Sequence, residues 1–131
     1  MEILDEYLDE LSQDTSLDEF TVKDMQMKLP AIKHKWAGRL IRTKFEITSL
    51  ERKRNNLINA AVKQLIETSP VTLAVPLARS RVEDLDDIQQ INRKIEDTKT
   101  IVEFLEKAEK ILNSMTFDIK NLTEIMKLET H

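Results

Sequence analysis

The residues of this chain that could do chemistry are cations crowded into one segment. Residues 28–63 contain ten lysines and arginines and only two glutamates, a net charge of +8. On a helix turning about 100° per residue, Lys35, Arg42 and Lys53 fall opposite the apolar stripe. The candidate binding residues are Lys35, Arg39, Arg42, Lys44, Arg52, Lys53, Arg54 and Lys63. Such a surface predicts binding of a polyanion by counterion release, with a steep dependence on salt.

An acidic segment precedes the basic one and could neutralise it. Residues 1–27 hold nine acids and one lysine, a net charge of −8, whereas residues 64–131 have a net charge of −4. One interpretation is that this acidic arm pairs with the basic segment, within one subunit or between subunits. The other is that the basic segment binds a polyanion. Both can hold at once, because an acidic arm can compete with nucleic acid for the same cations.

Three residues of the basic segment have individual interpretations. Trp36 falls on the apolar stripe, which favours a core or interface role. Phe45 falls on the polar side near Arg42 and Arg52, where an exposed ring could stack on a base or contact another subunit. Arg54 falls on the stripe itself, where a charged residue can set the helix register or reach an acid on another subunit.

Most enzyme chemistry finds no support in the sequence. The chain has one glycine, no cysteine and two histidines, His34 and His131, far apart in sequence. A phosphate-binding glycine loop, a thiolate site and a histidine metal site are therefore not expected, and we predict a non-enzymatic protein without cofactor or metal. The acidic N-terminus and the lack of a long apolar run argue against export and membrane insertion, and a reducing cytosol fits.

The elements that must position the cations are predicted to be helices, since one glycine and three prolines are too few for a β-rich fold. The apolar spacing predicts a short helix over residues 2–12 and a long basic helix over 30–67. Ser16 and Glu19 resemble a capping box, which would start a helix near residue 16 or 17. Pro30 lies either in the first turn of the long helix or at a kink.

The second half of the chain is predicted as a loop followed by helices. Residues 68–82 hold two prolines and alternating apolar residues, which fit a loop packed on helix ends or an extended segment that pairs with a partner chain. Helices are expected over 83–129, with a break near 113–116 where Thr116 could cap a final helix. These helices are also the expected site of oligomerisation.

Together these elements predict a single all-α domain over residues 1–131. Its fold class is a long antiparallel helical hairpin with a short N-terminal acidic helix. A two-helix hairpin makes a thin core, so we expect homo-oligomerisation into a ring-like helical bundle. The expected core or oligomer residues are Trp36, Ile95, Val102, Leu105, Leu112, Ile119 and Leu122.

A set of residues spread over nearly the whole chain also carries a family resemblance. The set comprises Leu4, Tyr7, Glu10, Leu11, Asp14, Leu17 and Asp18, then Lys35-Trp36, Lys44, Glu46, Leu50 and Glu51, and finally Phe117-x-Ile119-Lys120-x-Leu122, Glu124 and Glu129. In this order the chain resembles the UvsY family, the recombination mediators of T4-like bacteriophages. The resemblance rests on the ordered set rather than on one specific motif.

The resemblance implies a closed ring of about six or seven subunits that binds single-stranded DNA. Such proteins help a RecA-like recombinase to displace the single-strand-binding protein, which implies a role in the host cytoplasm. The family's DNA-binding Lys-x-Arg pair falls on Asn59 and Ala61 here. Either this role has moved to Arg52-Lys53-Arg54 and Lys63 nearby or the affinity for DNA is weaker, and we expect the first. The alternatives are a structural or chaperone-like hairpin oligomer, similar in architecture to prefoldin, and a scaffold that binds proteins through its acidic arm.

Overall fold

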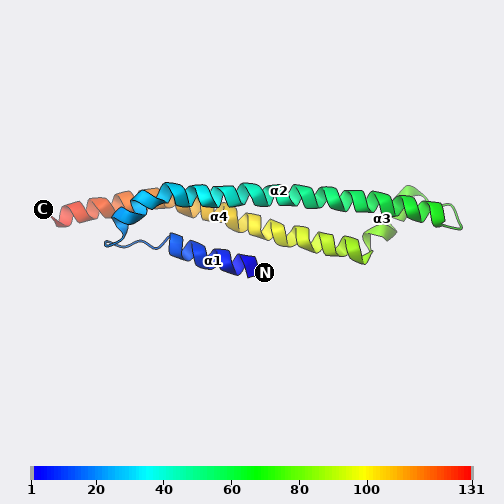
Figure 1. The fold of residues 1–131 in the computed structure, drawn as a ribbon, viewed down its shortest axis with the longest axis horizontal. Helices are drawn as coiled ribbons and strands as arrows, with labels where there is room; N and C mark the ends of the chain where they lie inside the picture. Colours follow the sequence, from blue (N-terminus) through cyan, green and yellow to red (C-terminus); the bar gives the residue numbers. More distant parts are fainter. Residues whose placement is uncertain (1, 131) are drawn as a thin grey trace. The chain divides into compact units, whose positions relative to one another are not determined.

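The computed structural model describes residues 2–130, and 88% of these residues are helical. Within the described residues there are four helices and no strand: α1 (Glu2–Asp14), α2 (Val22–Thr68), α3 (Val75–Glu83) and α4 (Asp86–Glu129) (Figure 1). The predicted all-α hairpin with a short N-terminal helix is confirmed. His131, the second of the two histidines, lies outside the described residues.

The helices form two compact units, and α2 and α4 each contribute to both. The first unit contains the residues up to Arg42 and those from Ile101 onward, so it combines α1 with the start of α2 and the end of α4. The second unit is Thr43–Thr100 and combines the rest of α2 and α4 with α3.

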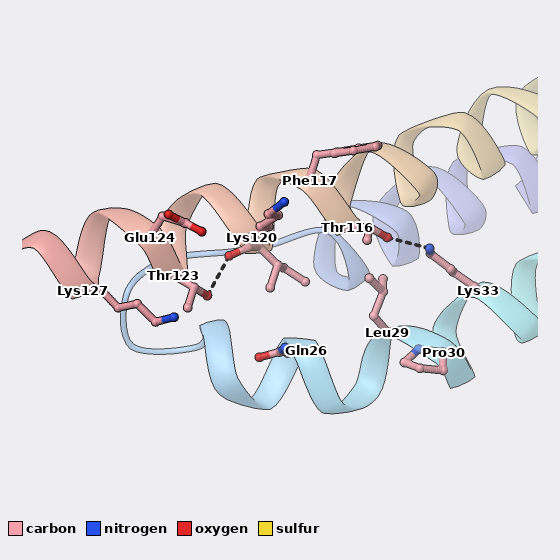
Figure 2. A pocket seen from close by; sticks show the side chains of 11 residues that line it. Gln26, Leu29, Pro30, Lys33, Thr116, Phe117, Lys120, Thr123, Glu124 and Lys127 are labelled. Carbon is pink, nitrogen blue, oxygen red and sulfur yellow. Dashed lines mark hydrogen bonds between the residues drawn. The ribbon is translucent and has the colours of Figure 1, made fainter.

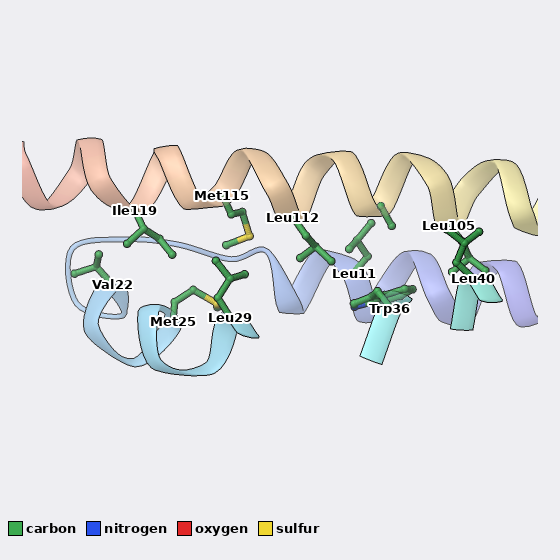
Figure 3. Close-up of a cluster of buried hydrophobic side chains, with 11 residues drawn as sticks. Leu11, Val22, Met25, Leu29, Trp36, Leu40, Leu105, Leu112, Met115 and Ile119 are labelled. Carbon is green, nitrogen blue, oxygen red and sulfur yellow. The ribbon is translucent and has the colours of Figure 1, made fainter. Parts of the chain in front are cut away.

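The core of the first unit is a row of apolar side chains from three helices (Figure 3). Each helix is amphipathic, and its apolar stripe can leave water only by facing the other two. The buried side chains are Leu11 from α1, Val22, Met25, Leu29, Trp36 and Leu40 from α2, and Leu105, Ala108, Leu112, Met115 and Ile119 from α4. Val102 and Leu122 are half-buried and pack against this row. Each large side chain buried in this way contributes about 1.5–3 kcal/mol.

Trp36 is the largest buried side chain of the first unit and is only 1% exposed. Its ring meets Tyr7 of α1 at a centroid distance of 5.6 Å and Phe104 of α4 at 6.1 Å, both edge to face. Edge-to-face aromatic pairs add about 0.5–1.5 kcal/mol each to the burial term. Trp36 therefore joins α1, α2 and α4 at one point.

The link between α1 and α2 differs from the prediction. Asp18 Oδ1 accepts hydrogen bonds from the backbone N–H groups of Phe20 (2.8 Å) and Thr21 (3.0 Å), and Thr21 Oγ1 accepts one from the Asp18 N–H (3.1 Å). These bonds satisfy donors just before α2, which begins at Val22. The predicted capping box at Ser16 and Glu19 is wrong, since Asp18 and Thr21 perform the same reciprocal capping two residues later.

Pro30 lies inside α2 rather than in its first turn. A proline has no N–H, so Pro30 cannot donate the helical hydrogen bond to the carbonyl of Gln26. The preceding turns still remain helical, because Val22, Met25 and Leu29 are buried against α4 on one stripe. Packing of this stripe therefore outweighs the local cost of the proline.

In the second unit, α3 occupies part of the segment 68–82 that was predicted as a loop. Pro76 stands in its first turn, where the missing N–H costs nothing. Ala78 and Val82 are buried on one face of α3, and Val82 clusters with Ile58 of α2 and Ile88 of α4. Ala78 and Val82 lie four residues apart, so a helix buries both on one face. This burial stabilises a helix in a sequence whose prolines favoured a loop.

The fourth helix is unbroken between Asp86 and Glu129, so the predicted break near 113–116 is wrong. Met115 and Ile119 continue the apolar stripe of Leu112 and are buried in the core of the first unit. The polar residues Asn113 and Ser114 lie on the exposed side and do not interrupt it. Earlier in α4, in the second unit, Ile95 is fully buried.

Candidate nucleic-acid interface

The cations of the basic segment fall into different environments, and the first of these is a paired cluster. Lys35 Nζ contacts Asp14 Oδ2 at 2.6 Å, and the Nε1–H of Trp36 donates to the same oxygen at 2.8 Å. The guanidinium of Arg39 donates to both carboxylate oxygens of Glu10. Two acids of α1 are thus held by three donor side chains within residues 35–39 of α2, and the fork geometry of Arg39 suits a carboxylate.

The aromatic rings of the core lie directly beside these ion pairs. The guanidinium carbon of Arg39 lies 4.7 Å from the centroids of both the Tyr7 and the Trp36 ring, and Lys35 Nζ lies 5.5 Å from the Trp36 ring. The side chain of Arg39 is only 20% exposed. Cations held over aromatic faces and partly removed from water are bound more firmly than surface pairs. In this structure Lys35 and Arg39 fasten the acidic helix to the hairpin.

Arg42 is the last candidate cation of the first unit, and its side chain is exposed. Its guanidinium lies back along α2 toward Gly38, where a Cβ would meet one of its nitrogens at 3.6 Å. That distance is an ordinary contact, so Gly38 leaves room for the arginine but is not required for it. Arg42 keeps its charge at the surface.

The second unit holds a different group of cations, which face solvent. Arg52, Lys53 and Lys63 are exposed, and no ion pair involves them among the residues that the structure describes. Lys44 is exposed as well. Arg52, Lys53 and Lys63 could therefore meet a polyanion without first losing an acidic partner.

An aromatic residue shares one face of α2 with two of these cations. Phe45 is 70% exposed. It precedes Arg52 by seven residues, and Arg52 precedes Lys63 by eleven, spacings that return to the same side of an α-helix. An exposed ring in line with two cations provides a stacking surface for a base next to donors for its phosphates.

Arg54 behaves differently from its neighbours. It is half-buried, and its Nη1 donates a 3.2 Å hydrogen bond to Oδ1 of Asn92 on α4. Arg54 also lines a polar cavity of about 360 Å³ that α3 closes with Arg79 and Glu83. Arg54 lies on the apolar stripe of α2 and contacts α4 of the same chain from there.

The sequence interpretation missed two cations, Arg79 and Arg81, because it assigned their segment to a loop. Both are exposed on α3, since Ala78 and Val82 take the buried face. Arg79 pairs with Glu83 one turn later at 3.2 Å, and both side chains are about half exposed. Arg81 lines a second cavity together with Ala61 of α2. The signal was present as two arginines two residues apart after Pro76.

Neither a metal site nor a membrane-spanning helix is found among the described residues. Within residues 2–130, no group of three or more His, Cys, Asp or Glu side chains could hold a metal ion. In the same range no helix is both apolar and long enough to cross a bilayer.

The chain is similar to known proteins both in sequence and in fold. The sequence profile of one family, described as "Recombination, repair and ssDNA binding protein UvsY", matches residues 10–130. Two crystal structures of the recombination mediator protein UvsY of bacteriophage T4 are similar in fold. One, in lattice type IV, has a TM-score of 0.81 at 16% identity and covers 96% of this chain and 98% of the T4 chain. The other, in lattice type II, has a TM-score of 0.79 at 15% identity and covers 98% of both chains. No curated protein sequence matches significantly.

Proposed function

This chain belongs to the UvsY family, and on that premise we propose that it binds single-stranded DNA through the exposed cations of α2. In this proposal it is a recombination mediator that helps a RecA-like recombinase to load onto DNA coated by single-strand-binding protein. It works in phage homologous recombination and repair, in the cytoplasm of the host cell.

The observation that carries the proposal is the exposed face of α2 in the second unit. Phe45, Arg52 and Lys63 lie in line on it, and Lys53 lies about one quarter-turn away. A flexible strand can place successive phosphates on such cations and stack a base on the ring, whatever the base sequence. Each phosphate contact releases counterions, which makes the affinity depend on salt.

Assembly would multiply these weak contacts. We propose a homo-oligomeric ring of about six or seven copies, in which one strand meets the same cations on each subunit. Linked weak sites give tight binding that no single subunit achieves. A strand held in this way would be offered to the recombinase in an ordered shape.

The test is a triple charge reversal, Arg52→Glu with Lys53→Glu and Lys63→Glu. Its affinity for a labelled oligo(dT), measured by fluorescence anisotropy at low salt, should fall by about a hundredfold, because three phosphate contacts become repulsive. The slope of log affinity against log salt should become shallower by about two units for the three lost contacts.

The matched control reverses three exposed lysines of α4, Lys94→Glu, Lys107→Glu and Lys110→Glu, which changes the net charge by the same amount. It should weaken binding far less than the α2 variant. Wild-type binding that is micromolar or weaker at low salt, without a salt slope, would reject the proposal. That result would favour a helical oligomer with no nucleic-acid role.

A further inference from the structure

An apolar groove with a cationic rim lies in the first unit, between the start of α2 and the end of α4. It has a volume of about 690 Å³, within the range of ligand-binding clefts. Figure 2 shows Gln26, Leu29 and Pro30 of α2 across from the residues of α4 that line it. Leu29 and Ile119 are buried and form an apolar floor.

The rim of the groove is positively charged and carries an exposed aromatic ring. Lys33, Lys120 and Lys127 line it against one acid, Glu124. Lys33 donates a 2.8 Å hydrogen bond to the hydroxyl of Thr116, which directs its ammonium to the groove (Figure 2). Phe117 lies at the rim and is 69% exposed. An occupant that complements this surface has bulky apolar side chains on one side and carboxylates beside them.

The same unit already shows how this hairpin holds a segment of that chemistry. Helix α1 is acidic and amphipathic, buries Leu11 in the core and places Glu10 and Asp14 on Lys35 and Arg39. An apolar floor flanked by cations is thus the arrangement that binds α1. The groove repeats this arrangement with Lys33, Lys120 and Lys127, and α1 does not line it.

We propose that the groove is a docking site for an acidic amphipathic segment of another protein. The segment binds as a helix, with bulky apolar side chains over Leu29 and Ile119 and carboxylates on Lys120 and Lys127. The site shares no residue with the cations proposed for DNA, so the protein can hold a partner and a strand together. The proposal does not depend on DNA binding.

The experiment uses the full chain and a labelled peptide with the sequence of residues 2–14, a soluble acidic amphipathic probe. Anisotropy should detect binding to the wild type. The double reversal Lys120→Glu with Lys127→Glu should weaken it by at least about tenfold, since two attractive contacts become repulsive. The control reversal Lys107→Glu with Lys110→Glu, on the same helix outside the groove, should leave it within about twofold. Oligo(dT) affinity should change little in both variants.

A second variant tests the apolar half of the site. Phe117→Ser should also weaken peptide binding, while circular dichroism and oligo(dT) affinity stay as in the wild type, because the ring is exposed. Peptide binding that is absent from the wild type, or equal in wild type and double reversal, overturns the proposal. A lower mass of Phe117→Ser in multi-angle light scattering also overturns it, since a second copy of the chain would then cover the groove.

Discussion

The basic segment of α2 divides into two stretches, residues 28–42 in the first unit and residues 43–63 in the second. Both stretches are rich in lysine and arginine, but the surroundings of these cations differ. In the first stretch, Lys35 and Arg39 lie under α1 and contact Glu10 and Asp14. In the second stretch, Arg52, Lys53 and Lys63 face solvent and make no ion pair among the described residues. The charges of Lys35 and Arg39 stabilise the fold, whereas those of Arg52, Lys53 and Lys63 stay accessible to a ligand.

The aromatic residues of α2 follow the same division. Trp36 stands among the paired cations and is buried between Tyr7 and Phe104. Phe45 stands at the start of the second stretch and is exposed. The density of positive charge along the sequence therefore does not by itself define an accessible surface. Whether another helix covers the cations decides their accessibility.

The largest expected effect comes from removing the aromatic anchor of the paired stretch. Trp36→Ala should lower the free energy of unfolding by about 3–5 kcal/mol, because it empties a buried site and removes two ring contacts. Urea denaturation followed by circular dichroism measures this change.

Phe45→Ala is the matched variant in the second stretch. It should change the free energy of unfolding by less than about 0.5 kcal/mol, since the ring is exposed. It should also weaken oligo(dT) binding by about fivefold or more if a base stacks on the ring. Equal destabilisation by the two variants would remove the contrast between the stretches.

A smaller effect is expected when the acids of α1 are neutralised without changing their shape. Glu10→Gln with Asp14→Asn should lower the free energy of unfolding by about 1–3 kcal/mol, because partly buried charged hydrogen bonds become neutral ones. Oligo(dT) affinity at low salt should rise severalfold, since the double variant removes two negative charges beside Lys35 and Arg39.

The control for this variant is Asp5→Asn with Asp9→Asn, which removes two exposed acids from the same helix. It should leave stability nearly unchanged and raise DNA affinity less. If both pairs raise the affinity equally, α1 acts only through its overall charge and does not compete for particular cations.

Periodicity predicted the fold well where helices are long. The apolar stripes of α2 and α4 recur over many turns, so their pairing followed from burial alone. The segment around Ala78 was different, because two prolines in a short stretch resemble a loop. Only the tertiary burial of Ala78 and Val82 makes it helical, and no local pattern encodes that burial.

The candidate site could be predicted only in part for a similar reason. The charge distribution predicted the cations of α2, including Lys35 and Arg39. It also indicated that the acidic arm could compete with nucleic acid for them. Which cations the acidic arm covers depends on how α1 packs against Trp36. That packing includes a hydrogen bond between Trp36 and Asp14, which lie 22 residues apart in sequence, so no local pattern predicts it. The arginines of α3 were missed because their segment was predicted as a loop. Without a helix assignment, the sequence does not show which side chains share a face.

The smallest expected effect concerns one of those arginines and would extend the second stretch to α3. Arg79 is half exposed and shares a polar cavity with Arg54. If a strand on α2 also reaches α3, Arg79→Ala should weaken oligo(dT) binding by about threefold and reduce the salt slope by about 0.7, the share of one phosphate contact on a single strand. Arg93→Ala, an exposed arginine on α4, is the matched control and should change neither quantity. An unaltered salt slope in the Arg79 variant would confine the DNA surface to α2. Arg79 would then act through its ion pair with Glu83 and not through a phosphate.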